Sequence, residues 1–351
     1  MKKDFELLEA LYCLYSPSNG EKKMRRFIKK ECIERGASVY TDNGNLYVTK
    51  GESDTYPCIV AHTDQVQKNH STDFKVMVAD DIIFGYSPKS KSQQGLGADD
   101  KNGIWIALQC LERFDVMKCA FFAGEEIGCV GSGKADMKFF NDVRFVIEPD
   151  RRNGGDLITS ISGDICSDEF KAALPSKEFG YKETEGLMTD VEELCEKGVG
   201  VSCINFSCGY YHPHTDEECT SWSELCNALN FAIAIVEKCT DVYKHEYTYY
   251  SRYSRYTRWD DYDYDRYDKY LKSYKKDDKK NEKQIDDGDS YWDMYDHDYN
   301  AMDMILESEP YLTFAEVVDM YSGWFHLDDL DELEGIYSDV SYNVEQKYYA
   351  S

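Results

Sequence analysis

The sequence Gly95-Leu-Gly-Ala-Asp-Asp-Lys-Asn-Gly103 is followed by an apolar run at 104–108. This order predicts a loop that opens a helix and holds two adjacent carboxylates, Asp99 and Asp100, between glycines. Glycines on both sides of the pair allow the backbone to approach a site closely. One carboxylate can bridge two metal ions, because each of its oxygens can bind one. The stretch is therefore predicted to lie at a two-metal centre, provided that other segments supply the remaining ligands.

Four runs elsewhere have the length and composition of buried strands, at 57–61, 118–123, 143–147 and 199–206. His62, Glu126 and Asp150 each come just after one of the first three runs. His214 lies a few residues beyond the fourth, on a loop. In open α/β sheets, ligands gather at the carboxyl ends of the strands. We therefore expect these four side chains to converge on the carboxylate pair.

The remaining segments of the first 240 residues alternate between helical and extended patterns. Helices are predicted at 5–15, 23–35, 102–113 and 221–239, the last opened by the capping signature Ser221-Trp-Ser-Glu224. A strand is predicted at 46–50, a hairpin at 74–84 and a polar loop at 87–97. Strand, candidate ligand and helix follow one another repeatedly. This order predicts a three-layer α/β/α fold with a mixed, mostly parallel central sheet.

Each candidate ligand has an ordinary alternative when taken alone. His62 could be a strand-end histidine paired with a surface aspartate, and His212 and His214 could both be loop histidines. Adjacent acidic residues occur by chance in a chain with 67 Asp and Glu among 351 residues. The segment Glu148-Pro-Asp150 offers two ligands, of which Asp150 lies further along the strand. Separate coincidences at five positions are less probable than one site.

Two further carboxylates are predicted to support the site. Asp64 follows His62 by two residues and so lies on the same side of an extended chain, where it could orient the imidazole. In the pair Glu125-Glu126 one carboxylate can bind metal, while the other stays free as a general base for water. The five predicted ligands are imidazoles and carboxylates, which suits Zn²⁺, or Mn²⁺ or Co²⁺, rather than iron–sulfur or copper(I) chemistry.

Composition excludes several other classes of function. The net charge of −27 argues against nucleic-acid binding through a broad basic surface. No apolar run approaches the roughly 18 residues of a membrane span, and the N-terminus lacks the apolar core of a secretory signal. The thirteen cysteines are odd in number and include no Cys-x-x-Cys pair. Reduced thiols in a cytoplasmic compartment are therefore expected.

The composition changes at about residue 241. Residues 241–300 contain 14 of the 29 tyrosines, many Asp, Lys and Arg residues, and almost no aliphatic ones. Such a segment cannot bury enough aliphatic surface to offset the entropy of ordering. We predict a catalytic domain at 1–240, a low-complexity linker at 241–300 that is mobile and protease-sensitive, and a small helical appendage at 301–351.

The ordered set of motifs resembles a known superfamily. His62-Thr-Asp64, Gly97-Ala-Asp-Asp-Lys101, Glu125-Glu126, Asp150 and His214-Thr215 follow the order found in the co-catalytic di-zinc exopeptidases. These include the zinc aminopeptidases, peptidase T, and carboxypeptidase and aminoacylase relatives. The resemblance covers about residues 1–240. It implies that Asp99 bridges two zinc ions, one held also by His62 and Asp150, the other by Glu126 and His214.

The resemblance also implies supporting roles and an activity. Asp99 would be joined to Asp100 by a cis peptide bond, Glu125 would be the general base, and Asp64 would support His62. The implied reaction is hydrolysis of the N-terminal peptide bond of short peptides. The interval from Asp150 to His214 is too short for the inserted lid domain of many relatives, so a lidless form is expected. The alternatives are an amide deacylase or dipeptidase of the same superfamily, and a non-catalytic scaffold that binds partners through its tail.

Overall fold

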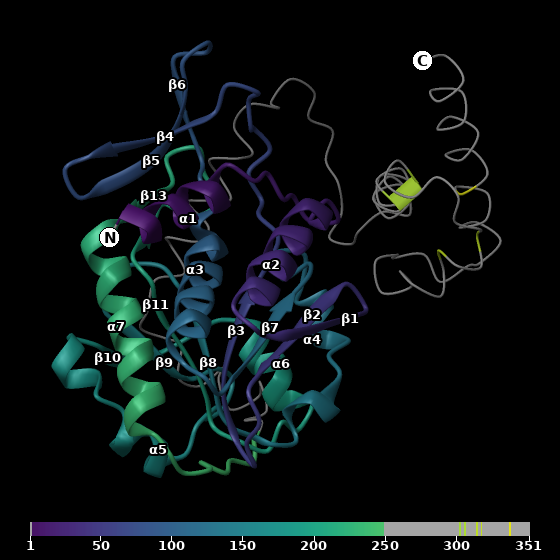
Figure 1. Cartoon of the computed structure of the whole chain (residues 1–351), viewed down its shortest axis with the longest axis vertical. Helices are drawn as coiled ribbons and strands as arrows, with labels where there is room; N and C mark the ends of the chain where they lie inside the picture. Colours follow the sequence, from purple (N-terminus) through teal and green to yellow (C-terminus); the bar gives the residue numbers. More distant parts are fainter. Residues whose placement is uncertain are drawn as a thin grey trace, which may run out of the picture. The chain divides into compact units, whose positions relative to one another are not determined.

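The central sheet has eight strands in the order β1-β2-β7-β3-β8-β11-β9-β10 (Figure 1). β7, β3, β8 and β11 are parallel neighbours, β1, β2 and β7 are joined antiparallel, β9 is antiparallel to β11, and β10 is parallel to β9. The predicted mixed, mostly parallel sheet is confirmed. The strands are β1 (Ser38–Asp42), β2 (Asn45–Lys50), β3 (Tyr56–His62), β7 (Met117–Phe122), β8 (Val143–Arg151), β9 (Asp156–Ser160), β10 (Lys182–Glu185) and β11 (Cys203–Ser207).

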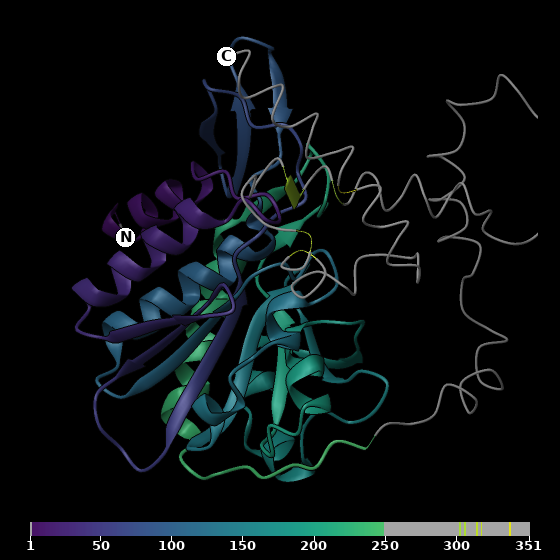
Figure 2. The ribbon, with the colours of Figure 1, turned by 90° about the vertical axis from the view of Figure 1, so that its right-hand side faces the viewer.

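Helices cover both faces of this sheet and complete the predicted three layers (Figure 2). One face carries α1 (Lys2–Tyr12), α2 (Lys22–Glu34), α3 (Ala98–Arg113) and α7 (Trp222–Lys238). The other carries α6 (Asp190–Glu196) and the 3-10 turn η1 (Met137–Phe140), with the short α4 (Val130–Gly133) packed against α6. The remaining short helices are α5 (Asp168–Ala173) and η2 (Ser176–Phe179).

The central strands are buried on both faces because their alternate side chains enter two cores. In β3, Ile59 and Ala61 pack with the residues of α1, α2, α3 and α7, whereas Cys58 and Val60 pack with those of α6 and η1. Strands buried on both faces read as continuous apolar runs rather than as alternating patterns. This is why the sequence predicts them clearly.

A second sheet of five strands carries the hairpin predicted at 74–84. Its order is β12-β13-β5-β4, with β6 also paired to β5, and its β4–β6 part projects beyond the helices in Figure 1. The bounds are β4 (Lys75–Ala79), β5 (Ile82–Ser87), β6 (Ser92–Gln94), β12 (Tyr210–Tyr211) and β13 (Cys219–Ser221). β6 falls in the segment predicted as a loop. Because β13 pairs with β5, the loop that contains His214 is attached to this hairpin.

The computed structural model describes residues 2–248 and, beyond them, residues 302, 305, 306, 314, 317 and 337. The chain divides into two units, Met1–Arg258 and Trp259–Ser351, and the fold given above belongs to the first. The predicted linker at 241–300 and appendage at 301–351 lie almost entirely outside the described residues. Their boundaries and the predicted protease sensitivity therefore stay predictions.

The structure also bears on the predicted helix cap, on the position of Asp150 and on the state of the cysteines. The Ser221 hydroxyl accepts the Glu224 N–H at 3.3 Å, as the capping signature predicts. β8 extends to Arg151, so Asp150 lies inside the strand rather than after its end. All thirteen cysteines have free thiols. Among the described helices, none has the length and apolar character needed to cross a bilayer.

The first turn of α3 supplies a stability prediction. The Gly103 N–H donates to Asp100 Oδ1 at 2.9 Å, and a Cβ at position 103 would lie 2.4 Å from the same oxygen. Replacing a glycine inside a helix by alanine normally stabilises by roughly 1 kcal/mol. For Gly103→Ala we expect the opposite, a Tm lower by at least about 3 °C, because the carboxylate must move.

Gly133→Ala is the matched control, since its Cβ would come no closer than 3.7 Å to a neighbouring atom. Thermal unfolding of the two variants beside the unsubstituted protein makes the comparison. A Gly103→Ala protein with an unchanged or higher Tm would contradict the packing of Asp100 against α3.

Candidate metal centre

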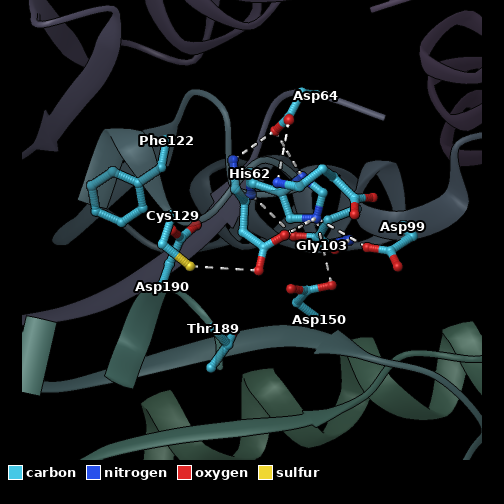
Figure 3. Close-up of polar contacts among 12 residues, drawn as sticks. His62, Asp64, Asp99, Gly103, Phe122, Cys129, Asp150, Thr189 and Asp190 are labelled. Carbon is cyan, nitrogen blue, oxygen red and sulfur yellow. Dashed lines mark hydrogen bonds and ion pairs between the residues drawn. The ribbon is translucent and has the colours of Figure 1, made fainter. Parts of the chain in front are cut away.

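The five predicted ligands meet at the carboxyl edge of the central sheet, and Figure 3 shows three of them, His62, Asp99 and Asp150. His62 ends β3 and Asp150 is the last residue but one of β8. Asp99 lies at the start of α3, while Glu126 and His214 lie on loops. Among the described residues they form two groups, His62–Asp99–Asp150 and Asp99–Glu126–His214, each with potential ligand atoms within 4.8 Å of one another. Asp99 is the member that the two groups share.

The Asp99 carboxylate lies between the two histidines. Its Oδ1 is 3.0 Å from His62 Nε2, and its Oδ2 is 3.4 Å from His214 Nε2. Different oxygens thus face different groups, which is the geometry that a bridging carboxylate requires. The Asp99–Asp100 peptide bond is cis, as the resemblance implies.

Asp64 connects the strand that carries His62 with the loop that carries the glutamates. Its Oδ1 lies 3.3 Å from His62 Nδ1, a close contact outside good hydrogen-bond alignment, and the imidazole then turns Nε2 toward the centre. The Asp64 carboxylate also accepts the N–H groups of Glu125 (3.0 Å) and Glu126 (3.3 Å) and the Ser18 hydroxyl (2.7 Å). Asp64 therefore lies beside the His62 imidazole, as the spacing of the two residues in the sequence predicts.

The two glutamates face the centre differently. Glu126 Oε2 lies 3.0 Å from His214 Nε2, and its Oε1 is buried with no hydrogen-bond partner in the described part of the chain. Glu125 belongs to neither group, although its Oε2 lies 3.9 Å from His62 Nε2. Its Oε1 lies 3.7 Å from the Cys129 sulfur. Glu126 thus belongs to a group that could hold a metal ion, whereas Glu125 lies beside the two groups.

Carboxylates outnumber cationic side chains in and around the centre. Burial raises the pKa values of Glu125, Glu126 and Asp150, and neighbouring carboxylates raise them further. Negative charge cannot accumulate in a buried site without protons or cations to balance it. The carboxylates concerned are Asp64, Asp99, Asp100, Glu125, Glu126, Glu148, Asp150, Asp190 and Glu218, and the basic side chains are His62, His214 and Lys101.

The neighbouring carboxylates also raise the pKa values of the two histidines, His62 and His214. Burial lowers the pKa of His62, but Asp150, Asp64 and Asp99 outweigh it and leave the pKa well above its usual value. Hydrogen bonds to Asp99 and Glu126 raise the pKa of His214 to about 11. Both rings thus lie where the electrostatic potential favours a positive charge. That charge can be a proton, or a metal cation bound to the same nitrogen.

Three further carboxylates around the centre, Asp100, Glu148 and Asp190, are not among the five ligands predicted from the sequence. Asp100 Oδ2 accepts the His62 N–H at 3.3 Å, and Glu148 Oε2 accepts the Thr189 hydroxyl at 2.7 Å. Asp190 accepts the Ser132 hydroxyl at 2.5 Å. Asp100 and Glu148 each lie next to or near a predicted ligand in a sequence motif, so the sequence does indicate that they are close to the centre. Asp190 lies in a stretch without a motif.

Four other polar side chains near the centre, those of Arg151, Tyr210, Tyr211 and His212, belong to neither ligand group. The exposed His212 belongs to neither group, and Arg151 pairs with Asp156 at 3.4 Å. The Tyr210 hydroxyl lies 3.5 Å from Asp150 Oδ1, whereas the Tyr211 hydroxyl donates to Glu224 at 2.7 Å. Of these two tyrosines, Tyr210 is therefore the one beside a predicted ligand.

Known proteins match this chain through structure alone. No protein-family model and no curated protein sequence matches it. The aminopeptidase PepT of Bacillus cereus superposes with a TM-score of 0.52 at 14% identity, over 68% of this chain and 98% of that one. A tripeptidase of Staphylococcus aureus gives 0.55 at 14% identity, over 67% and 97%. A TET aminopeptidase of a marine sediment archaeon gives 0.55 at 14% identity, over 68% and 98%.

The chain has the fold of these aminopeptidases and of this tripeptidase. The prediction made from the ordered motifs is thereby confirmed for the architecture of the central sheet and its helices. At 14% sequence identity, structural similarity shows the fold and not the activity. Within this shared fold, any function of this chain has to be argued from the side chains at the centre.

A pH-dependent stability is expected for the metal-free protein. Burial raises the pKa of Asp190, the first residue of α6, so the folded state keeps a proton that the unfolded state loses above about pH 4. The free energy of unfolding therefore falls as the pH rises from about 4 to 7. Above pH 7 buried Lys101 adds the opposite slope, because burial lowers its pKa to about 7.

Asp190→Asn should flatten this decline, because the titrating group is removed. Asp168→Asn is the matched control, since Asp168 also opens a helix but has a side chain 99% exposed. Denaturant unfolding at several pH values in the presence of a chelator measures the slopes. Equal slopes for Asp190→Asn and Asp168→Asn would contradict the burial of a protonated Asp190.

Proposed function

We propose that this protein is a metal-dependent exopeptidase that hydrolyses the N-terminal peptide bond of short peptides. The observation that carries the proposal is the sharing of Asp99 by two ligand groups, with Glu125 beside them but part of neither. A bridging carboxylate next to a free carboxylate is the arrangement that two-metal hydrolysis of an amide needs.

The side chains present fit a pair of zinc ions, or Mn²⁺ or Co²⁺. Each group offers one imidazole and two carboxylates, a donor set suited to these ions. The buried, unpartnered Oε1 of Glu126 and the excess of buried carboxylates are further support, since bound cations would satisfy both. When bound, the ions would polarise the scissile carbonyl and lower the pKa of water toward about 7.

In this proposal Glu125 moves the proton. It accepts a proton from the attacking water as the new C–O bond forms, and donates it to the amine nitrogen as the C–N bond breaks. Burial and the nearby Asp190 raise the pKa of Glu125, although His62 opposes them, so the carboxyl can hold the proton between the two steps. Asp64 fixes the Glu125 backbone N–H at 3.0 Å and thereby aims the side chain.

The proposed substrate is a short peptide with a free N-terminus. Asp216 and Glu217 are exposed on the loop of His214, and a negative rim attracts an α-ammonium group. The interval between Asp150 and His214 folds into β9, α5, η2, β10, α6, β11 and β12, which leaves no segment for a separate lid. The free thiols and the net charge of −27 fit a cytoplasmic protein that acts on peptides rather than on nucleic acid.

Two alternatives are kept. A deacylase or dipeptidase of the same superfamily would use the same centre on amides that are not peptide N-termini. A scaffold without catalysis would have no need for Glu125 beside a full ligand set, and the geometry therefore favours an enzyme.

Replacing each of the two glutamates by glutamine tests their roles. Glu125→Gln should keep both metal ions and lower kcat by about 10² or more, because the base is lost. Glu126→Gln should instead weaken metal binding, since Glu126 belongs to a ligand group. Elemental analysis combined with steady-state kinetics separates the two effects. The reverse pattern would mean that the two roles are exchanged.

Blocking the substrate's α-amino group tests the reaction class. Aminoacyl anilides and short free peptides should be cleaved, and their N-acetylated forms should have a kcat/KM lower by at least about tenfold, or roughly 1.4 kcal/mol. The acetyl group of the blocked substrate removes the positive charge that the acidic rim attracts. Equal or faster turnover of N-acyl amino acids would favour the deacylase.

A further inference from the structure

Glu218 is a buried carboxylate outside the ligand set. Its Oε2 accepts the Ala98 N–H at 3.0 Å, and its Oε1 accepts the Asp99 N–H at 3.3 Å. The side chain has no exposed surface. Both oxygens thus hold successive amides of the turn from which the Asp99 carboxylate projects toward the centre.

The backbone of Glu218 is fixed from the other side. The next residue, Cys219, pairs with Phe84 of β5, and the Thr220 hydroxyl lies 2.9 Å from the Tyr12 hydroxyl. Asn102, in α3, donates to the same Thr220 oxygen at 3.3 Å. The carboxylate therefore reaches the Asp99 turn from an anchored strand and cannot simply follow the turn if it moves.

The same segment carries His214, four residues earlier in the chain. The His214 side chain is 49% exposed, and the ion-pair contacts it makes within the described chain are to Asp99 and Glu126. Its position therefore depends largely on its loop. A Cβ on Gly95 would lie 2.6 Å from the Thr215 carbonyl oxygen, so the loops before Asp99 and after His214 are in direct contact.

A carboxylate suits this position and an amide does not. Both groups that Glu218 receives are N–H donors, and a carboxylate offers an acceptor oxygen to each. A glutamine would turn its NH₂ toward one of these donors and leave that backbone N–H without an acceptor. Leaving a buried donor unsatisfied costs about 1–3 kcal/mol, which would displace the turn.

We propose that Glu218 is a positioning residue that joins the turn of Asp99 to the loop of His214, and so sets the affinity of the centre for both ions. The inference rests on the proposed two-metal function and adds to it a residue that touches neither ion. Because Asp99 is shared, a displaced turn should weaken both groups. The group containing His214 should lose more, because its loop is released as well.

Titration of metal-free protein with Co²⁺ and Zn²⁺ tests this inference. We expect Glu218→Gln to weaken the binding of both ions by about tenfold or more, and to alter the visible spectrum of the Co²⁺ protein. Glu218→Asp keeps the charge and one acceptor contact, so its affinities should fall between those of Glu218→Gln and the unsubstituted protein. Glu217→Gln is the matched control, because the neighbouring side chain is exposed.

The possible outcomes distinguish a failure of the proposed two-metal function from a failure of the positioning role of Glu218. Unsubstituted protein that binds no metal would overturn the proposed function itself. Two ions bound with unchanged affinity and spectrum in both Glu218 variants would overturn only the positioning role. If Glu218→Gln does not fold, Glu218→Asp decides, and an affinity equal to that of Glu217→Gln would contradict the inference. Thermal unfolding of the metal-free variants shows whether each is folded.

Discussion

The carboxylate of Asp99 has to face two histidines at once, and much of the surrounding structure serves that constraint. Its two oxygens lie 3.0 Å from His62 Nε2 and 3.4 Å from His214 Nε2, so a small rotation would lose one contact. The turn before it uses Gly97 at a φ of +64°, where a Cβ would meet Gln65. Asp100 closes the turn from the other side by accepting the Gly103 N–H.

Charge is the second constraint, and it follows from the first. Gathering acidic side chains around Asp99 is costly in a buried site unless positive charge balances them. His62 and His214 supply too little, since burial still raises the pKa values of Glu126 and Asp150. Two divalent cations at the two groups would remove this imbalance. The ligand geometry and the electrostatics therefore both support the proposed pair of metal ions.

The sequence predicts the elements whose patterns are strong. β3, β7 and β8 are buried on both faces, and their continuous apolar runs locate His62, Glu126 and Asp150 at one edge of the sheet. β10 has the sequence Lys-Glu-Thr-Glu and mostly exposed side chains, so no hydrophobic period marks it. α6 is only seven residues long, and its role at the centre comes from the tertiary packing that buries Asp190.

Glu218 shows the same limit at the level of one side chain. It stands in the acidic run Asp216-Glu-Glu218, which reads as a solvated rim, and the first two residues are indeed exposed. The third turns inward because β13 begins at Cys219 and pairs with β5. Local sequence cannot reveal this, since the partner strand lies more than a hundred residues earlier in the chain.

Anomalous diffraction from zinc-soaked crystals tests the central claim most directly. The account predicts two anomalous peaks per chain, about 3.5–4 Å apart, on either side of the Asp99 carboxylate, one beside His62 and Asp150 and the other beside Glu126 and His214. No peak at Asp99, or a single peak that contacts only one of the two histidines, would contradict it.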